Sequence, residues 1–175
     1  MRREANMKFE TLYQELTGSA EIIRALLAGL TQEEAQFKPS PAAWSILEVT
    51  CHFYDEECED FREHLDFILH PQNEEWHSID PQGWVVKRKY NEQNFIEMQT
   101  RFFTERAKSL EWLKGLSDTD WNITRTTPLG SASAGEMLAS WIAHDNLHIR
   151  QLVELRRARI ENITQPYAIL YAGDW

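Results

Sequence analysis

The segment SWIAHDNLHIRQL (residues 140–152) decides the fold, because it combines a helical hydrophobic period with two histidines one turn apart. On a helix with about 100° per residue, His148 lies roughly 40° from His144. Trp141 and Leu155 fall on the same stripe, at roughly 60° and 20° from His144. Both imidazoles are therefore expected to face inward, where helix bundles build metal sites. For this pair alone, two well-satisfied core histidines are an open alternative.

The rest of the chain carries the same helical period in three further segments. The predicted helices run from about Met7 to Leu30, Ser45 to Leu69, Asn91 to Leu116 and Ser133 to Ile160. Capping boxes, in which a hydroxyl side chain and a glutamate three residues later satisfy each other's backbone amides, mark helix starts at Thr31/Glu34, Ser45/Glu48 and Ser133/Glu136. Trp44 is expected to anchor the start of the second long helix.

Long helices with almost no alternating strand pattern predict an all-α fold, an antiparallel four-helix bundle in a single domain over residues 1–175. Residues 71–90 lack a helical period and predict a long loop between the second and third helices; such loops are often functional. Residues 117–130 predict a short capped turn followed by extended chain. The aromatic segment TQPYAILYAGDW (164–175) is expected to pack over the bundle or at a subunit interface.

The composition excludes several classes of function. The chain has 18 Lys and Arg against 28 Asp and Glu, a net charge of −10, and such a surface repels the phosphate backbone of nucleic acids. No apolar run approaches the roughly 18–20 residues that a membrane span requires. The N-terminal segment MRREANMKFE lacks the apolar stretch of a secretion signal. We therefore expect a cytoplasmic protein that binds neither nucleic acid nor membrane.

The two cysteines, Cys51 and Cys58, predict structural thiols rather than redox chemistry. Seven positions apart on a helix, they are separated by roughly 10 Å along the axis, too far for a disulfide. Both fall on the apolar side of their segment, so we expect both to be buried.

A third histidine would strengthen a metal site, and His52, near the start of the second long helix, is the best candidate. Its helical period groups it with polar residues that include Glu48 and Glu56, so it is expected to point toward water or a cleft. A ligand at an open end of the bundle, with carboxylates as hydrogen-bond acceptors, would be compatible with that direction. The other histidines are expected to be solvated or incidental: His64, His70 and His77.

Two segments resemble the signatures of the DinB/YfiT-like four-helix proteins. AAWSILEVTCHFYDEE (42–57) has a tryptophan, an apolar helix start and a histidine followed by acids, and HDNLHIRQL (144–152) fits the pattern H-D-x-x-H-x-x-Q-[LI]. The spacing of the signatures, TTPLGSASAGEMLASWIAHD (126–145), and the loop that contains Asp80, Trp84 and Tyr90 are similar to the same family. The resemblance covers roughly residues 10–155.

The resemblance implies an antiparallel four-helix bundle with a divalent metal ion held by three histidines. The matching positions here are His52, His144 and His148, and zinc or nickel is the usual ion. Family members include thiol-dependent transferases, such as bacillithiol transferases and maleylpyruvate isomerases, and many proteins described only as metal-dependent hydrolases. Homodimers are frequent in the family.

These inferences predict a metal-dependent enzyme that acts on a small molecule, as a hydrolase or as an S-transferase of a low-molecular-weight thiol. An ion on three imidazoles keeps an open position and can activate either water or a thiol. Asp145, Glu56 and Gln151 are candidates for acid–base or ligand-orienting roles. The alternative is a non-catalytic, metal-binding dimeric bundle with a stress or sensing role. A metalloprotease of the H-E-x-x-H type is disfavoured, because Asp145 replaces the glutamate base.

Overall fold

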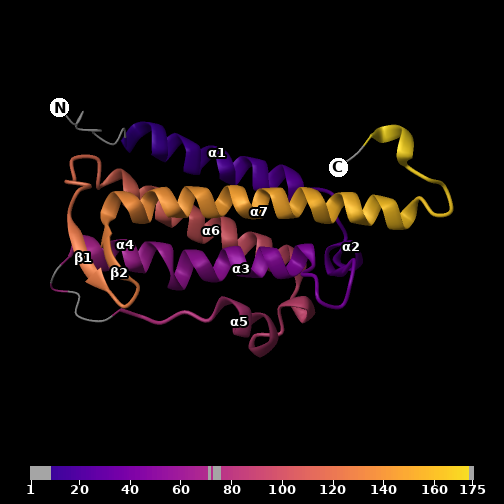
Figure 1. The fold of residues 1–175 in the computed structure, drawn as a ribbon, viewed down its shortest axis with the longest axis horizontal. Helices are drawn as coiled ribbons and strands as arrows, with labels where there is room; N and C mark the ends of the chain where they lie inside the picture. Colours follow the sequence, from indigo (N-terminus) through magenta and orange to yellow (C-terminus); the bar gives the residue numbers. More distant parts are fainter. Residues whose placement is uncertain (1–8, 71, 73–75, 174–175) are drawn as a thin grey trace.

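The computed structural model of this chain describes residues 9–70, 72 and 76–173, and its long helices lie along one axis (Figure 1). They are α1 (Phe9–Leu27), α3 (Ile46–Glu59) continued by α4 (Phe61–Leu69), α6 (Phe95–Lys114) and α7 (Ala134–Ile163). A short helix, α2 (Gln32–Gln36), lies between α1 and α3. The predicted all-α four-helix bundle is confirmed. Residues 7 and 8 of the predicted first helix, and Pro71, predicted to stop the second, lie outside the described residues.

The helices run as two parallel pairs. Contacts between α3 and α6 advance together along both helices, from Phe53 on Phe102 to Glu57 with Arg106 four residues later. α1 and α7 also share a direction (Figure 1). The predicted antiparallel packing is seen between helices that short connections join, whereas the connection from α4 to α6 returns along the bundle and makes α3 and α6 parallel. Within the described ranges, no helix is long and apolar enough to cross a membrane.

The second long helix is divided at Asp60, where the sequence predicts continuous helix from Ser45 to Leu69. Asp60 has φ −126° and ψ −94°, outside the helical region. Hydrogen bonds continue on both sides, from the Asp60 amide to the Glu56 carbonyl (3.3 Å) and from the His64 amide to the Asp60 carbonyl (2.8 Å). The break is therefore a local kink, and the Asp60 carboxylate stabilises it through the His64 ring (2.6 Å).

The connection from α4 to α6 contains more regular structure than the loop predicted for residues 71–90. α5 (Pro81–Lys87) begins with Asp80 as its N-cap and a proline in its first turn, a favoured helix start. A single 3-10 turn, η1 (Tyr90–Glu92), follows it. Trp84 and Tyr90 are buried in the core with residues of α3 and anchor the connection to the bundle. The prediction of irregular loop is therefore wrong for α5.

The segments that precede and follow α7 both differ from their sequence predictions. A β-hairpin of β1 (Thr124–Thr127) and β2 (Gly130–Ser133) precedes it, where the sequence predicts only extended chain. After α7 the chain extends past the ends of the other helices and then turns back (Figure 1). Its side chains Tyr167, Leu170 and Tyr171 are largely exposed. The prediction that this segment packs over the bundle is wrong for its described residues. Its alternative, a subunit interface, stays a prediction.

A layer of buried polar side chains crosses the middle of the bundle between two apolar clusters. One cluster, around Phe53, Phe102 and Leu152, lies toward α2, and the other, around Phe61 and Trp141, lies toward the hairpin. Every long helix contributes to the polar layer between them: Ser19, His52, Asp55, Glu56, Glu57, Arg106, Ser109, Asp145 and His148. Burying polar groups is costly unless partners satisfy them, so this layer is where a functional site is expected.

Candidate metal centre

Three histidine side chains from two helices meet within the polar layer. His52 extends from α3, and His144 and His148 extend from successive turns of α7. Their Nε2 atoms form a triangle, 3.2 Å from His52 to His144, 3.1 Å from His52 to His148 and 3.1 Å between His144 and His148. The prediction that these rings converge on a common point is confirmed. Metal binding by the three rings stays a prediction.

The size of this triangle fits a first-row divalent ion. Metal–imidazole bonds are about 2.0–2.1 Å long, which puts nitrogens roughly 3.3–3.4 Å apart at tetrahedral angles and roughly 2.8–3.0 Å apart at right angles. The observed separations of 3.1–3.2 Å lie between these values. The three side chains can therefore hold one ion without large movement, and three protein ligands leave at least one coordination position for another molecule.

The environment keeps all three imidazoles neutral, which is the form that binds metals. Burial, and then the neighbouring His148 and His144, lower the pKa of His52 to about 2. Burial, and then His148, lower the pKa of His144 to about 4. Burial also lowers the pKa of His148, against the opposing effect of its hydrogen bond to Gln151. The site therefore holds three neutral ring nitrogens close together, an arrangement that a bound cation would stabilise.

Gln151 and Glu56, both predicted near the site, face the outer nitrogens of two rings. Gln151 Oε1 lies 2.7 Å from His148 Nδ1, so this nitrogen donates a proton and leaves the Nε2 lone pair for a ligand. Glu56 Oε1 lies 3.4 Å from His52 Nδ1, and neither buried atom has a hydrogen-bond partner among the described residues. A small approach would complete the carboxylate–imidazole pair that commonly orients metal-binding histidines. Burial and a hydrogen bond to Asp60 raise the pKa of Glu56 to about 10, and a cation nearby would oppose that rise.

Asp145 follows His144 in the chain but contacts other helices rather than the rings. Its carboxylate accepts two hydrogen bonds from the Arg106 guanidinium (2.6 and 2.9 Å) and one from Ser19. Arg106 also donates to Glu57 (2.6 Å), which completes a buried ion cluster across α1, α3, α6 and α7. A catalytic role for Asp145 is untested, and these contacts favour a structural one.

The expectation that His52 points toward water or a cleft is wrong. The residue is 3% exposed, because α7 and Trp44 cover this face of α3, and the Trp44 ring centroid lies 5.2 Å from that of His52. The misleading signal came from Glu48 and Glu56, which share the face with His52 and are buried as well. Lys38 compensates Glu48 with an ion pair (2.9 Å). Acidic residues are rarely buried without such partners, so periodicity alone assigns this face to solvent.

His64 is buried, which contradicts the expectation of a solvated or incidental role. Its Nδ1 lies 2.6 Å from Asp60, its Nε2 lies 2.8 Å from the His77 carbonyl, and its ring stacks on Trp76 at 3.7 Å. Burial alone would lower the pKa of His64, but these hydrogen bonds outweigh it and raise the pKa. The ring therefore ties the long connection to the kink at Asp60. His70 and His77 are partly exposed.

Both cysteines are free thiols. Cys51 is buried, as predicted, and Cys58 is only partly buried, so that prediction is confirmed for one residue. Burial is the largest factor that raises the pKa of Cys51 to about 12 and of Cys58 to about 11. At neutral pH the reactive thiolate is scarce at both positions, which agrees with structural roles.

A cavity of about 500 Å³ reaches the histidine cluster at His148. Its walls come from the segment before α3, the start of α5 and the second half of α7, with these lining residues: Pro39, Ala42, Ala43, Trp44, Gln82, His148, Gln151, Glu154, Leu155 and Ala158. The Trp44 ring, expected only to anchor a helix start, lies nearly parallel to the His148 ring (4°, centroids 6.3 Å apart). Sequence reasoning missed Gln82 and Glu154, because a cavity between three segments leaves no signature in the period of one helix.

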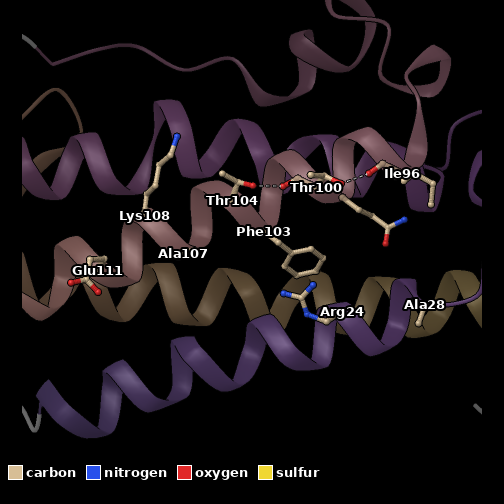
Figure 2. Close-up of a pocket in the computed structure, with 10 residues that line it drawn as sticks. Arg24, Ala28, Ile96, Thr100, Phe103, Thr104, Ala107, Lys108 and Glu111 are labelled. Atoms are coloured by element: carbon tan, nitrogen blue, oxygen red, sulfur yellow. Dashed lines mark hydrogen bonds between the residues drawn. The ribbon is translucent and has the colours of Figure 1, made fainter.

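A larger groove of about 820 Å³ lies elsewhere, between α1 and α6. Figure 2 shows Arg24 of α1 beside Phe103 of α6, with the guanidinium carbon 3.8 Å from the ring centroid. None of the three clustered histidines lines this groove. We therefore place the candidate site at the smaller cavity.

Comparisons with known proteins identify a family and a shared fold. The sequence profile of the DinB superfamily matches residues 15–152. Among solved structures, YfiT from Bacillus subtilis matches with a TM-score of 0.75 and 15% sequence identity, over 90% of this chain and 91% of that chain. YfiT is described as a probable metal-dependent hydrolase with an unusual four-helix bundle topology. At this level of identity the match establishes a shared fold. No protein of curated function matches the sequence significantly.

Proposed function

This chain belongs to the DinB superfamily, and from that premise we propose that it is a metal-dependent hydrolase of a small molecule. The observation that carries the proposal is the triangle of Nε2 atoms from His52, His144 and His148. We propose zinc or nickel as the ion, since neutral imidazoles suit both. The description of YfiT as a probable metal-dependent hydrolase supports the same chemistry.

The side chains around the rings have distinct tasks in this proposal. A divalent ion on three neutral imidazoles supplies Lewis acidity and lowers the pKa of water toward about 7. Gln151 fixes the tautomer of His148 through the 2.7 Å contact at Nδ1. Glu56, 3.4 Å from His52 Nδ1, would orient His52 by moving closer and accepting a hydrogen bond from this nitrogen. Trp44 covers His52 and His148 and keeps bulk water away from that side of the rings.

Two rival functions use the same cluster. A thiol S-transferase would activate an external thiol at the ion, because neither cysteine of the chain lines the cavity. A non-catalytic dimeric bundle would use the ion for stability or sensing. The exposed side chains of Tyr167, Leu170 and Tyr171 support a proposed homodimer interface, which light scattering of the purified protein would test.

The test begins with protein stripped by a chelator and reloaded with zinc or nickel. We expect one ion per chain by elemental analysis, and metal-dependent hydrolysis within a panel of chromogenic esters, amides and lactones without added thiol. His148→Ala should lose both, whereas His70→Ala, a histidine outside the cluster, should keep both.

Other outcomes select the rivals. Turnover that requires a low-molecular-weight thiol would replace the hydrolase with an S-transferase. Stoichiometric metal without turnover under either condition would favour the non-catalytic bundle. Failure to bind any divalent ion would contradict all three.

A further inference from the structure

The cavity that reaches His148 combines apolar and polar side chains, and its described lining residues bring no cation. Its described walls are mainly apolar side chains, contributed by Pro39, Ala42, Ala43, Trp44, Leu155 and Ala158. The polar residues among those that line it are Gln82, His148, Gln151 and Glu154. No lysine or arginine is among the described residues that line it. At about 500 Å³, the cavity is in the size range of sites for small molecules.

Basic side chains close to the cavity in the sequence are paired with acidic side chains or with a backbone carbonyl. Their partners are Glu48 for Lys38 (2.9 Å), Glu154 for Arg150 (3.2 Å), the Leu26 carbonyl for Arg156 (2.7 Å) and Glu34 for Arg159. The pair of Arg150 with Glu154 is on the surface, with side chains 71% and 46% exposed. Exposed pairs of this kind are weak, so Arg150 only partly offsets the negative charge that Glu154 presents to the cavity.

We propose that the substrate is an uncharged or positively charged small molecule with an apolar body, and that Glu154 selects against anions. This inference rests on the proposed hydrolase function of the same site. The apolar body would pack against Trp44 and Leu155. The Gln151 amide nitrogen, which donates to none of the described residues, is free to bind a polar group. An anionic group remote from the ion would lose water and gain no cation, which is unfavourable.

The experiment compares three probes that share one metal-binding head group. They are benzohydroxamates with a methyl, an aminomethyl or a carboxylate group at the para position, which are similar in size but neutral, cationic or anionic. Dissociation constants are measured by titration calorimetry on the zinc-loaded protein. We expect the carboxylate probe to bind about tenfold more weakly than the methyl probe, and the aminomethyl probe at least as tightly as the methyl probe.

A charge reversal assigns the effect to one residue. Glu154→Lys should invert the order of the carboxylate and aminomethyl probes. Glu97→Lys is the matched control, since Glu97 is also an exposed carboxylate in an i,i+4 pair with an arginine, Arg101, but lies on α6 outside the cavity. The control should keep the wild-type order. Thermal unfolding of both variants verifies that they fold.

The outcomes separate this inference from the proposed function. Equal affinities, or tightest binding of the carboxylate probe, would overturn the inference and leave the hydrolase proposal standing. An unchanged order in Glu154→Lys would overturn the assignment to Glu154. If no probe binds the zinc-loaded protein, the ion is inaccessible from the cavity, and the inference and the proposed function both fail.

Discussion

Replacing Arg106 with methionine should lower the free energy of unfolding by about 4 kcal/mol at pH 7.5. The guanidinium donates two hydrogen bonds to Asp145 (2.6 and 2.9 Å) and one to Glu57 (2.6 Å), and each carboxylate residue is 1% exposed. Methionine replaces the aliphatic part of the arginine side chain but leaves both carboxylates buried without a counter-ion. Removing one partner of a buried ion pair costs about 3–5 kcal/mol. The folded protein can alternatively protonate one carboxyl, which for a group of ordinary pKa costs about 4 kcal/mol at this pH.

Protonation gives this loss a pH dependence. Burial already raises the pKa of Glu57 in spite of the opposing effect of Arg106, and removing Arg106 raises it further. A carboxyl whose pKa is raised by folding binds its proton more tightly in the folded state, so its stability is present at low pH and is lost as the pH rises. With Glu57 ionised beside Arg106 in the wild type and protonated in folded Arg106→Met, the difference in stability between the two proteins should shrink by about 1.4 kcal/mol per pH unit between pH 7.5 and 5.5.

Urea unfolding of metal-stripped protein, followed by circular dichroism at both pH values, measures this loss without a contribution from metal binding. Arg101→Met is the matched control on the same helix, because Arg101 is exposed and its ion pair is with Glu97 at the surface; its effect should stay within about 0.5 kcal/mol. Adding Asp145→Asn and Glu57→Gln to Arg106→Met should restore much of the stability. A loss below about 1 kcal/mol, or one that is independent of pH, would refute the assignment of two ionised carboxylates to Arg106.

Three further predictions concern the rings and the thiols. Zinc at about a thousand times its dissociation constant should stabilise the protein by about 4 kcal/mol and raise its Tm by roughly 8–16 °C, measured by scanning fluorimetry with and without chelator. His148→Ala should lose this increase, and an increase of the same size in the variant would show that zinc binds elsewhere. Glu56→Gln should weaken zinc affinity by about 10- to 100-fold in competition with a chromophoric chelator, and an unchanged affinity would separate Glu56 from His52. Because burial raises the pKa of Cys51 to about 12 and of Cys58 to about 11, iodoacetamide at pH 8 should alkylate both more than about tenfold faster in urea than in the folded protein, as followed by mass spectrometry; equal rates would contradict their burial.

Features encoded within a few residues could be predicted from the sequence. Ser45 with Glu48 and Ser133 with Glu136 both form the reciprocal hydrogen bonds of a capping box at the predicted helix starts. Such a start is predictable because its partners are three residues apart and need no tertiary contact. The shared face of His144 and His148 was predictable for the same reason, since it follows from spacing on one helix.

Features that depend on packing between distant segments could not be predicted in this way. The kink at Asp60 depends on His64, which is in turn fixed by Trp76 and the His77 carbonyl from the long connection. α5 is short, and its stability comes from the burial of Trp84 rather than from a helical period. The parallel arrangement of α3 and α6 follows from the path of the connection, and the hydrophobic period of a helix carries no information about its direction.

Arg106 shows where a signal was present but was not used. It lies four residues after Phe102 on the inward stripe of α6, so a charged residue occupies a core position. A charge at such a position requires buried partners of opposite charge, and the sequence supplies them at Glu57 and Asp145. The same reasoning applies to His52, whose acidic neighbours on α3 suggest solvent when each helix is considered alone.

The residues that pair with Arg106 are adjacent in the chain to residues of the histidine site. This adjacency couples the buried ion cluster to the rings. Glu56 faces His52 while its neighbour Glu57 pairs with Arg106, and His144 joins the triangle while its neighbour Asp145 pairs with the same guanidinium. Neighbouring residues of a helix point about 100° apart. One turn of α3 and one turn of α7 therefore each contribute to both the histidine site and the ion cluster. Arg106 thereby fixes the spacing of α3 and α7 at the level where their histidines must meet. Loss of its charge should consequently weaken zinc affinity as well as stability, although Arg106 touches none of the three rings through any hydrogen bond in the described structure.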